Sequence, residues 1–570
     1  MSNFRIYLIQ SLAVILLIFA GCQKQATPDI HPPVYGVMGK QAMVSTAHPA
    51  ATQVGVDILK SGGNAFDAAI AVQLALAVVY PRAGNIGGGG FLVYRQHDGN
   101  IGSLDFREMA PLQAHKDMYL DENQEVIENL STLGHLAAGV PGTVDGMIKI
   151  HQKLGSMPFK SLVQPAIDLA LGGVILTEKE ASKFNEHQEN FALVNEHRTH
   201  LQNEQPWKPG DTVFYPDLGQ TLTLIRDQGR AGFYDGTTAQ LIVEEMQRGG
   251  GLITLEDLQN YQAVWRQPIV GHYRSHKIIT MGLPSSGGIA ILQLLAGVEP
   301  HDIESWGFNQ PKTIHLMTEL ERRVYADRAT HLGDPDFYEV PIDMLLDHNY
   351  LTERYSSISY DRKTSSQDIK EGHVEIIESM ETTHFSIVDA LGNAASVTTT
   401  LNGSFGSKVV VKGAGFLLNN EMDDFSVKAG IPNMFGLVGA QANSIAPEKR
   451  MLSSMTPTIV EKNDTLYMVV GTPGGSTIIT SVFQTILNVI DHGMTMQEAV
   501  NAKKFHHQWL PDEVYYEVNA LDSATLSELS TMGHVMKPRS EIGRMDCIMV
   551  TDQGLEGAAD SRGDNTAMGY

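Results

Sequence analysis

The fold of this chain is decided by residues 382–402, which read TTHFSIVD from Thr382 to Asp389, ALG from Ala390 to Gly392 and NAASVTTTLN from Asn393 to Asn402. The first and last runs are rich in β-forming residues and alternate between apolar and polar side chains, which predicts two strands. The loop between them has three residues, and its last position needs a left-handed backbone, which glycine adopts readily. The stretch therefore predicts an antiparallel β-hairpin.

The register of this hairpin follows from its loop. If Asp389 pairs with Asn393, counting back along both strands places Thr382 opposite Thr400. Residues two apart in a strand point to the same face, so Thr400 and Asn402 should lie together. Three polar side chains would then converge at the start of the first strand. The spacing leaves two interpretations open, a functional site and a polar hairpin surface that faces solvent.

Composition limits the class of protein without identifying it. The 570 residues are 42% hydrophobic and 19% charged, which is ordinary for a globular protein. The formal net charge is -24 and no cluster of Lys and Arg stands out. This argues against nucleic acid as a partner.

The N-terminus reads as a targeting segment. Arg5 precedes a mostly apolar stretch, residues 6–20, that is too short for a transmembrane helix. Ala20-Gly21-Cys22 resembles a bacterial lipoprotein cleavage site, although Phe19 stands where Leu is usual. We expect residues 1–21 to be removed and Cys22 to carry a lipid, so that the protein is exported to the periplasm and touches the membrane only through this anchor. The alternative is a plain secretory signal in which Cys22 is incidental.

Helices and strands alternate along the rest of the chain, which predicts an α+β fold. Residues 49–80 carry small and apolar residues at helical spacing, and the four glycines 87–90 lead into a strand-like run, residues 91–94. A further helix is predicted for residues 313–332, where Gly333-Asp334-Pro335 stops it. Residues 356–381 are rich in Ser, Lys and Glu and predict an exposed stretch. Cys547 lies in an apolar run and predicts a buried, inert thiol.

From this hairpin onward, and in many motifs upstream, the sequence resembles the gamma-glutamyltransferase family of N-terminal-nucleophile hydrolases. The resemblance covers essentially residues 36–570. The matching motifs after residue 381 are TTHFSIVD, FLLNNEMDDFS, RMLSSMTPT, GTPGGSTIIT and FHHQWLPDE. Those before it include ATQVGVDILKSGGNAFDAAIAV, GNIGGGGFLVY, DFREMAP, GGLITLEDL, PSSGGI and YADRATHLGDPDF.

The resemblance implies a four-layer αββα sandwich, with helices flanking two stacked and mostly antiparallel sheets. It also implies that the chain cuts itself between Glu381 and Thr382. Residues 22–381 would become a large subunit and residues 382–570 a small one, and the two would stay together as one intertwined domain. Cleavage has a chemical reason, because a Thr hydroxyl needs a nearby base and the freed α-amine of the same residue can serve as one.

The family's catalytic roles carry over onto four positions. Thr382 would be the nucleophile and Thr400 the residue that orients it, in agreement with the hairpin register. Gly474 and Gly475 would supply the backbone N–H groups of an oxyanion hole, which in other enzymes contribute about 3 kcal/mol each. Without the resemblance, these two glycines would read as a plain turn between a strand and a helix.

The implied substrate group is a zwitterion, so its pocket needs both kinds of charge. Arg107 would bind the α-carboxylate in a planar, two-bond arrangement. The other residues implied for the pocket are Ser453 and Ser454 for the same carboxylate, Glu421 and Asp424 for the α-ammonium, and Asn402 in the wall. Phe435 lies in a segment that resembles the lid of the bacterial enzymes, where Tyr is common. It can cover the site but cannot latch it with a hydrogen bond.

The implied reaction needs no cofactor, and no motif predicts a metal site. Thr382 would attack the γ-glutamyl amide of glutathione or a related compound, and the acyl group would pass to water, an amino acid or a peptide. A related acylase, which removes a glutaryl group from a β-lactam such as a cephalosporin, is one rival. A glutaryl group has no α-ammonium, so Glu421 with Asp424 favours the glutamyl substrate. A lipid-anchored binding protein without catalysis is the other rival, against which the four catalytic positions together argue.

Overall fold

Two seven-stranded antiparallel sheets form the middle of the computed structural model, which describes residues 32–369 and 382–570. The first sheet runs in the order β1 (Val37–Gly39), β18 (Gly554–Ala559), β17 (Asp546–Thr551), β13 (Thr465–Val470), β12 (Thr458–Lys462), β9 (His276–Thr280) and β8 (Ile269–Tyr273). The second runs β19 (Thr566–Gly569), β2 (Met43–Thr46), β10 (Thr383–Val388), β11 (Ala394–Thr400), β3 (Gly89–Arg95), β4 (Ile101–Asp105) and β7 (Val264–Arg266). Strands from both ends of the chain therefore meet in each sheet.

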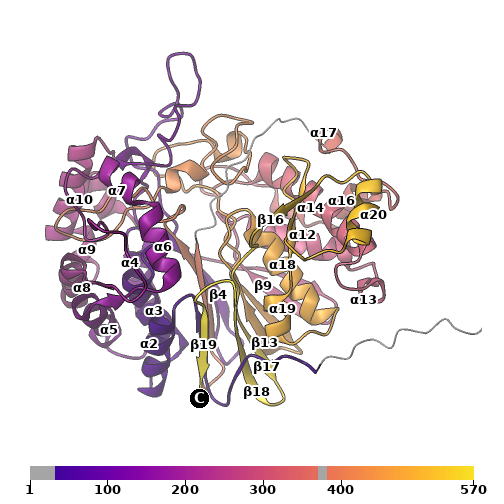
Figure 1. Ribbon diagram of the computed structural model, residues 1–570, viewed down its shortest axis with the longest axis horizontal. Coiled ribbons are helices and arrows are strands. Elements are labelled where there is room, and N and C mark those ends of the chain that lie inside the picture. The colour runs from indigo at the N-terminus through magenta and orange to yellow at the C-terminus, as the bar shows by residue number, and fades with distance from the viewer. Residues whose placement is uncertain (1–31, 370–381) are drawn as a thin grey trace, which may run out of the picture. The chain divides into compact units, whose positions relative to one another are not determined.

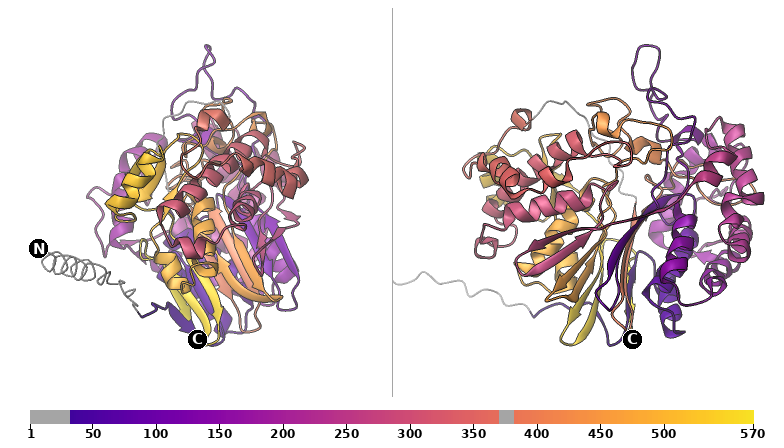
Figure 2. Two further views of the ribbon diagram at one scale, coloured as in Figure 1. Left: turned by 90° about the vertical axis from the view of Figure 1, so that its right-hand side faces the viewer. Right: turned by 180° about the vertical axis from the view of Figure 1, so that it is seen from behind.

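Helices cover the outer faces of both sheets within residues 35–570 (Figure 1, Figure 2). The second sheet is covered by α2 (Pro49–Lys60), α3 (Ala65–Val79), α4 (Thr143–Leu154), α5 (Phe159–Gly172), α6 (Glu178–Glu186), α7 (Gln188–Val194), α8 (Pro216–Gln228), α9 (Ala231–Tyr234), α10 (Gly236–Gly249) and α11 (Leu255–Asn260), among which α2, α3 and α4 touch its strands. On the side of the first sheet lie α12 (Gly287–Val298), α13 (Ile303–Trp306), α14 (Pro311–His331), α15 (Ile342–Leu345), α16 (His348–Ser356), α17 (Ser366–Ile369), α18 (Thr477–Ile490), α19 (Met496–Asn501) and α20 (Ser523–Thr531). The predicted αββα sandwich is confirmed.

The remaining elements of the fold are short. They are the 3-10 turns η1 (His135–Ala137), η2 (Glu421–Asp424) and η3 (Gln441–Asn443), the pair β5 (Val174–Ile175) and β6 (Thr212–Val213), and the small sheet of β14 (Phe505–His506), β15 (Val514–Glu517) and β16 (Met536–Arg539). No helix within residues 32–369 and 382–570 is both long and apolar enough to span a membrane.

The predicted hairpin lies at the centre of the second sheet. Thr383 pairs with Thr399 and Val388 with Ala394, which is the predicted register, and Gly392 has the left-handed φ of 89°. Every residue of β10 and β11 is buried, so the interpretation as a polar surface facing solvent is wrong. The strand also ends earlier than predicted, at Thr400, because Asn402 turns the backbone away with a φ of 76°.

Local sequence signals explain most other elements. The helical pattern of residues 49–80 forms two helices rather than one, because the Asn64 side chain caps the N-terminus of α3 by accepting from the N–H groups of Phe66 and Asp67. Helix α14 confirms the predicted helix before Gly333. Cys547 is fully buried, as predicted, and burial raises the pKa of its thiol. Residues 1–21, Cys22 and Glu381 lie outside the described residues.

Candidate active site

The site residues predicted from the sequence meet at the N-terminal end of β10. A cavity there is lined by Arg107, Thr382, Thr400, Asn402, Glu421, Asp424, Phe435, Leu437, Ser453, Ser454, Met455, Gly475 and Ile478. Gly474 is the one predicted residue of the described chain that does not line it. The cavity holds about 20 Å³ of free space, roughly what one water molecule needs. In this structure the walls of the pocket therefore lie against one another.

Thr382 is the residue around which the pocket is arranged. Its side chain is buried, and its hydroxyl donates to the Oγ1 of Thr400 over 3.4 Å. The N–H of Asn402 donates to the same oxygen at 2.8 Å. The turn at Asn402 thus fixes the Thr400 hydroxyl, and the position of Asn402 in the pocket comes from this turn and not from the strand alternation that predicted it.

The two glycines lie between β13 and α18. Gly474 has a φ of 140° and Gly475 a φ of 54°, both in the region that favours glycine. A Cβ on Gly475 would lie 2.4 Å from the Cδ1 of Phe435, so the ring occupies the space beside this backbone. The N–H groups at the start of a helix carry a partial positive charge. Such a turn is suited to hold a developing negative charge on a substrate oxygen.

The charged end of the pocket is an ion-pair cluster. Arg107, which is fully buried just after β4, contacts Glu421 closely and holds Asp424 at 2.5 Å. A third carboxyl group, that of Glu108, lies 3.6 Å from the same guanidinium. Burial raises the pKa of Glu108 to about 8 and that of Glu421 well above its ordinary value, against the opposing effect of Arg107. Burial thus favours the uncharged form of these two carboxyl groups, and a cation bound beside them would favour their charged form.

Ser453 and Ser454 both line the cavity. The Oγ of Ser453 accepts the N–H of Met455 at 3.1 Å. The Oγ of Ser454 accepts from the Nη2 of Arg328 at 3.2 Å. Because each oxygen already accepts a hydrogen bond from the protein, each hydroxyl hydrogen can be donated to a bound anion.

Phe435, which the resemblance implies to be a lid residue, lines the pocket. Its side chain is buried and cannot donate a hydrogen bond. Other hydrogen bonds fix this segment in place. The side chain of Asn433 donates to Asp424 at 2.9 Å, and the N–H of Met434 donates to Asp423 at 2.8 Å. The Nε2 of Gln508 donates to the carbonyl oxygen of Phe435 at 3.2 Å. The lid is therefore attached through its backbone and through Asn433.

Four contributors to the site are not among the residues predicted from the sequence. Leu437, Met455 and Ile478 supply its apolar wall, and an apolar residue in a buried segment carries no signal of its own. Arg328 supports Ser454 from outside the cavity. Met455, Ile478 and Arg328 lie within family motifs, but these motifs alone predict no role for them.

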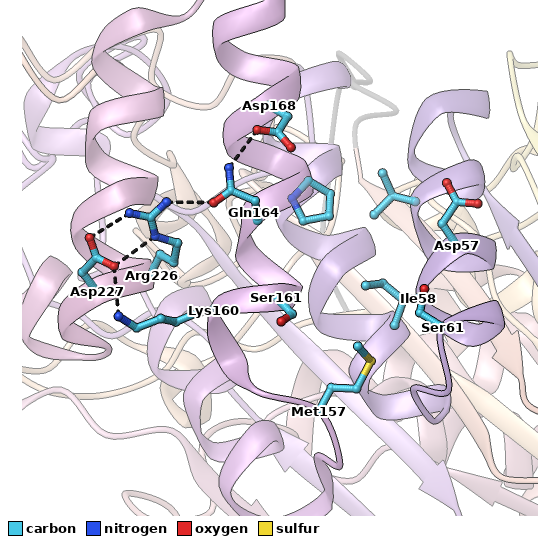
Figure 3. A pocket seen from close by; sticks show the side chains of 12 residues that line it. Asp57, Ile58, Ser61, Met157, Lys160, Ser161, Gln164, Asp168, Arg226 and Asp227 are labelled. Carbon is cyan, nitrogen blue, oxygen red and sulfur yellow. Dashed lines mark hydrogen bonds and ion pairs between the residues drawn. The ribbon is translucent and has the colours of Figure 1, made fainter.

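A larger groove, of about 720 Å³, lies elsewhere, between α2, α5 and α8 (Figure 3). Several of its polar side chains pair with one another, as Arg226 does with Asp227 at 2.9 Å and Lys160 with Asp227 at 3.3 Å. Gln164 also donates to Asp168 at 2.8 Å. None of the predicted site residues lines this groove, so size does not identify the site.

Two stacked antiparallel sheets between helical layers form the fold of the N-terminal-nucleophile hydrolases, and here Thr382 directly precedes a central strand. Residues 51–570 match the model of the family described as Gamma-glutamyltranspeptidase. The chain belongs to this family.

The chain is also similar to individual proteins over most of its length. The glutathione hydrolase proenzyme of Escherichia coli (strain K12) is 44% identical in an alignment of 575 residues that covers 99% of this chain and 99% of that one. The crystal structure of the cephalosporin acylase from Bacillus halodurans has a TM-score of 0.81 at 25% identity and covers 96% of this chain and 99% of that one. A chain of the Helicobacter pylori gamma-glutamyltranspeptidase has a TM-score of 0.56 at 41% identity, and the match covers 60% of this chain and 97% of that one.

Proposed function

We propose that this protein is a self-processing gamma-glutamyltransferase and glutathione hydrolase. The observation that carries the proposal is that one pocket contains two groups of side chains suited to this reaction. Thr382 and Thr400 share a hydrogen bond at one end, and the Arg107 ion-pair cluster lies at the other. The first suits acyl transfer to a hydroxyl, and the second suits a zwitterionic head group. The similarity to a glutathione hydrolase proenzyme at 44% identity supports the same function.

In the proposed reaction the Thr382 hydroxyl attacks the γ-amide carbon of the substrate. Its proton passes to the free α-amine of Thr382, whose reference pKa of about 7.7–8.0 suits a base near neutral pH. The negative charge on the carbonyl oxygen is held by N–H groups of the Gly474-Gly475 turn. The C–N bond then breaks, the proton moves to the departing amine, and an ester of Thr382 remains. Water, an amino acid or a peptide attacks this ester and restores the hydroxyl.

Without a ligand, Arg107 pairs with Glu421 and Asp424. A bound head group would break these ion pairs and form new ones with the same residues. The α-carboxylate would take the guanidinium of Arg107 and the hydroxyl groups of Ser453 and Ser454. The α-ammonium would take the carboxylates of Glu421 and Asp424. A buried charge that loses its partner is costly, so a ligand that offers both charges is preferred over one that offers a single charge.

Maturation is part of the proposal. Before cleavage the nitrogen of Thr382 is an amide and cannot act as a base, so the uncut chain should be inactive. Residues 22–381 and 382–570 would form a heterodimer within the one fold. The name proenzyme of the Escherichia coli relative supports processing, as does a Helicobacter pylori chain that corresponds to only 60% of this one.

The glutaryl acylase is the second candidate, because the cephalosporin acylase of Bacillus halodurans has the same fold. A glutaryl group lacks the α-ammonium, so it would leave both Glu421 and Asp424 unpaired in a buried site. This cost favours the glutamyl substrate.

The test is to purify the protein and the Thr382→Ala variant and to sequence the N-terminus of any small fragment. Wild type should yield two fragments, the smaller beginning Thr-Thr-His-Phe, and should release the amine from a γ-glutamyl anilide. Thr382→Ala should remain one chain without activity. An active enzyme that stays uncut would contradict the proposal.

A further inference from the structure

Helix α14 reaches the site from outside the cavity through two residues one turn apart. Tyr325 and Arg328 stand at positions i and i+3, so their side chains share a face of the helix. The hydroxyl of Tyr325 donates to the carbonyl oxygen of Ser476 at 2.5 Å, beside the Gly474-Gly475 turn. Arg328 points to the other half of the site, where the two serines lie.

The guanidinium of Arg328 is buried against neutral partners. Its Nε donates to the Oγ of Ser286 at 3.0 Å and its Nη2 to the Oγ of Ser454 at 3.2 Å. Ser286 in turn donates from its hydroxyl to the carbonyl oxygen of Ser453 at 2.7 Å. Arg328 therefore contacts Ser454 directly and is linked to Ser453 through Ser286.

The charge of Arg328 has no carboxylate partner of its own within the described residues, since both of its hydrogen bonds go to hydroxyl groups. Burial lowers its pKa, and the nearby Tyr325 and Asp424 oppose this effect. A buried, unneutralised cation is costly unless something compensates it. Ser454 also lines the cavity, so an anion bound there could accept its hydroxyl hydrogen.

We propose that Arg328 is a positioning residue for the α-carboxylate of the substrate: it fixes the Ser454 hydroxyl as a donor and supplies a second positive charge behind it. The proposal rests on the proposed function, because it concerns the same γ-glutamyl head group. Without Arg328, the Ser454 hydroxyl is free to turn away. The incoming carboxylate would then meet Arg107 as the one cation of the pocket lining, beside the carboxyl groups of Glu421 and Asp424.

The test compares two anilides that differ only at the α-carbon. The γ-glutamyl anilide carries the carboxylate, and the 4-aminobutyryl anilide keeps the amine but lacks the carboxylate. For Arg328→Gln we expect kcat/KM to fall at least roughly tenfold with the first, mainly through KM, and less than about threefold with the second. Arg328→Lys, which keeps the charge, should recover part of the loss.

Tyr325→Phe is the matched control, because it removes a buried hydrogen bond from the same helix face without touching the carboxylate end. It should lower kcat by a similar factor for both anilides. A second control is the pair of changes Arg328→Gln and Ser454→Ala. If Arg328 acts through Ser454, the double variant should lose much less than the product of the two single losses.

If Arg328→Gln lowers kcat/KM equally for both anilides, or does not lower it for the γ-glutamyl anilide, the proposal is overturned. If that variant does not fold, Ser286→Ala tests the same link with the guanidinium in place. A loss confined to the γ-glutamyl anilide supports the proposal and an equal loss contradicts it. Failure of the proposed function itself looks different, because wild type would then not turn over the γ-glutamyl anilide.

Discussion

Arg107 forms ion pairs with both Glu421 and Asp424 while no ligand is bound. The guanidinium and the two carboxylates are 314 and 317 positions apart in the sequence, yet they meet in a pocket with almost no free space. A zwitterionic head group can exchange these ion pairs for new ones without leaving a charge unpaired. A ligand with a single charge cannot, which makes the pocket selective at the level of individual residues.

Asp424 offers the sharpest test of this selectivity. A hydrogen bond to a charged group contributes about 1.5–3 kcal/mol, and each 1.4 kcal/mol is about tenfold. Asp424→Ala should therefore lower kcat/KM for a γ-glutamyl anilide at least roughly tenfold. A glutaryl anilide, which lacks the ammonium, should be affected far less. Steady-state kinetics of both substrates on both enzymes gives the comparison. Equal losses, or a wild type that prefers the glutaryl compound, would favour the acylase.

At the scale of elements, two turns decide how the site is built. The loop of the β10–β11 hairpin sets the register that brings Thr382 to Thr400, and the turn between β13 and α18 carries Gly474 and Gly475. Both turns contain a glycine with positive φ, at Gly392 and at Gly475. They differ in surroundings, because a Cβ on Gly392 would meet no heavy atom within 4 Å, whereas one on Gly475 would collide with Phe435.

These two glycines make a matched pair of substitutions. Gly392→Ala should cost about 1–2 kcal/mol of stability through backbone strain alone, and kcat should stay within about twofold of wild type. Gly475→Ala should lower kcat at least about tenfold, because the added methyl group displaces the ring of Phe435 and the N–H groups of the turn. Thermal melting and kcat measured for both variants separate the two effects. An unchanged kcat in Gly475→Ala would contradict the role of this turn.

At the scale of the whole molecule, β10, which follows Thr382 directly, lies inside a sheet that both termini of the described fold help to build. β2 near the start and β19 at the end of the chain flank β10 on one side. A cut before Thr382 would leave these neighbours in place, since β10 stays paired with β2 and β11. Cleavage before Thr382 would therefore leave the pairing of β10 with β2 and β11 intact.

The predicted lipid anchor would attach the whole protein to a membrane. If Ala20-Gly21-Cys22 is a lipoprotein site, mass spectrometry of the mature large subunit should find a lipid on Cys22, and the protein should fractionate with membranes. Cys22→Ser should release it without changing kcat, because Cys22 is not one of the proposed site residues. A soluble wild-type protein with an unmodified N-terminus elsewhere would leave only the plain secretory signal.

The sequence by itself determined the local features. Loop length and strand alternation sufficed for the hairpin register, and periodicity with the stop at Gly333-Asp334-Pro335 sufficed for α14. The family motifs pointed to the residues of the pocket. These predictions succeed because pairing across a short loop and helix termination depend on neighbours only a few residues away.

Only the tertiary structure decided which distant groups meet. It joined Arg107 to Glu421 and Asp424, brought Arg328 behind Ser454, and ended β11 at Thr400 so that Asn402 entered the pocket by a turn. Such contacts depend on how two sheets and their helices pack, and that packing is the sum of many small interactions along the whole chain. The periodicity of one segment contains no information about its distant partner.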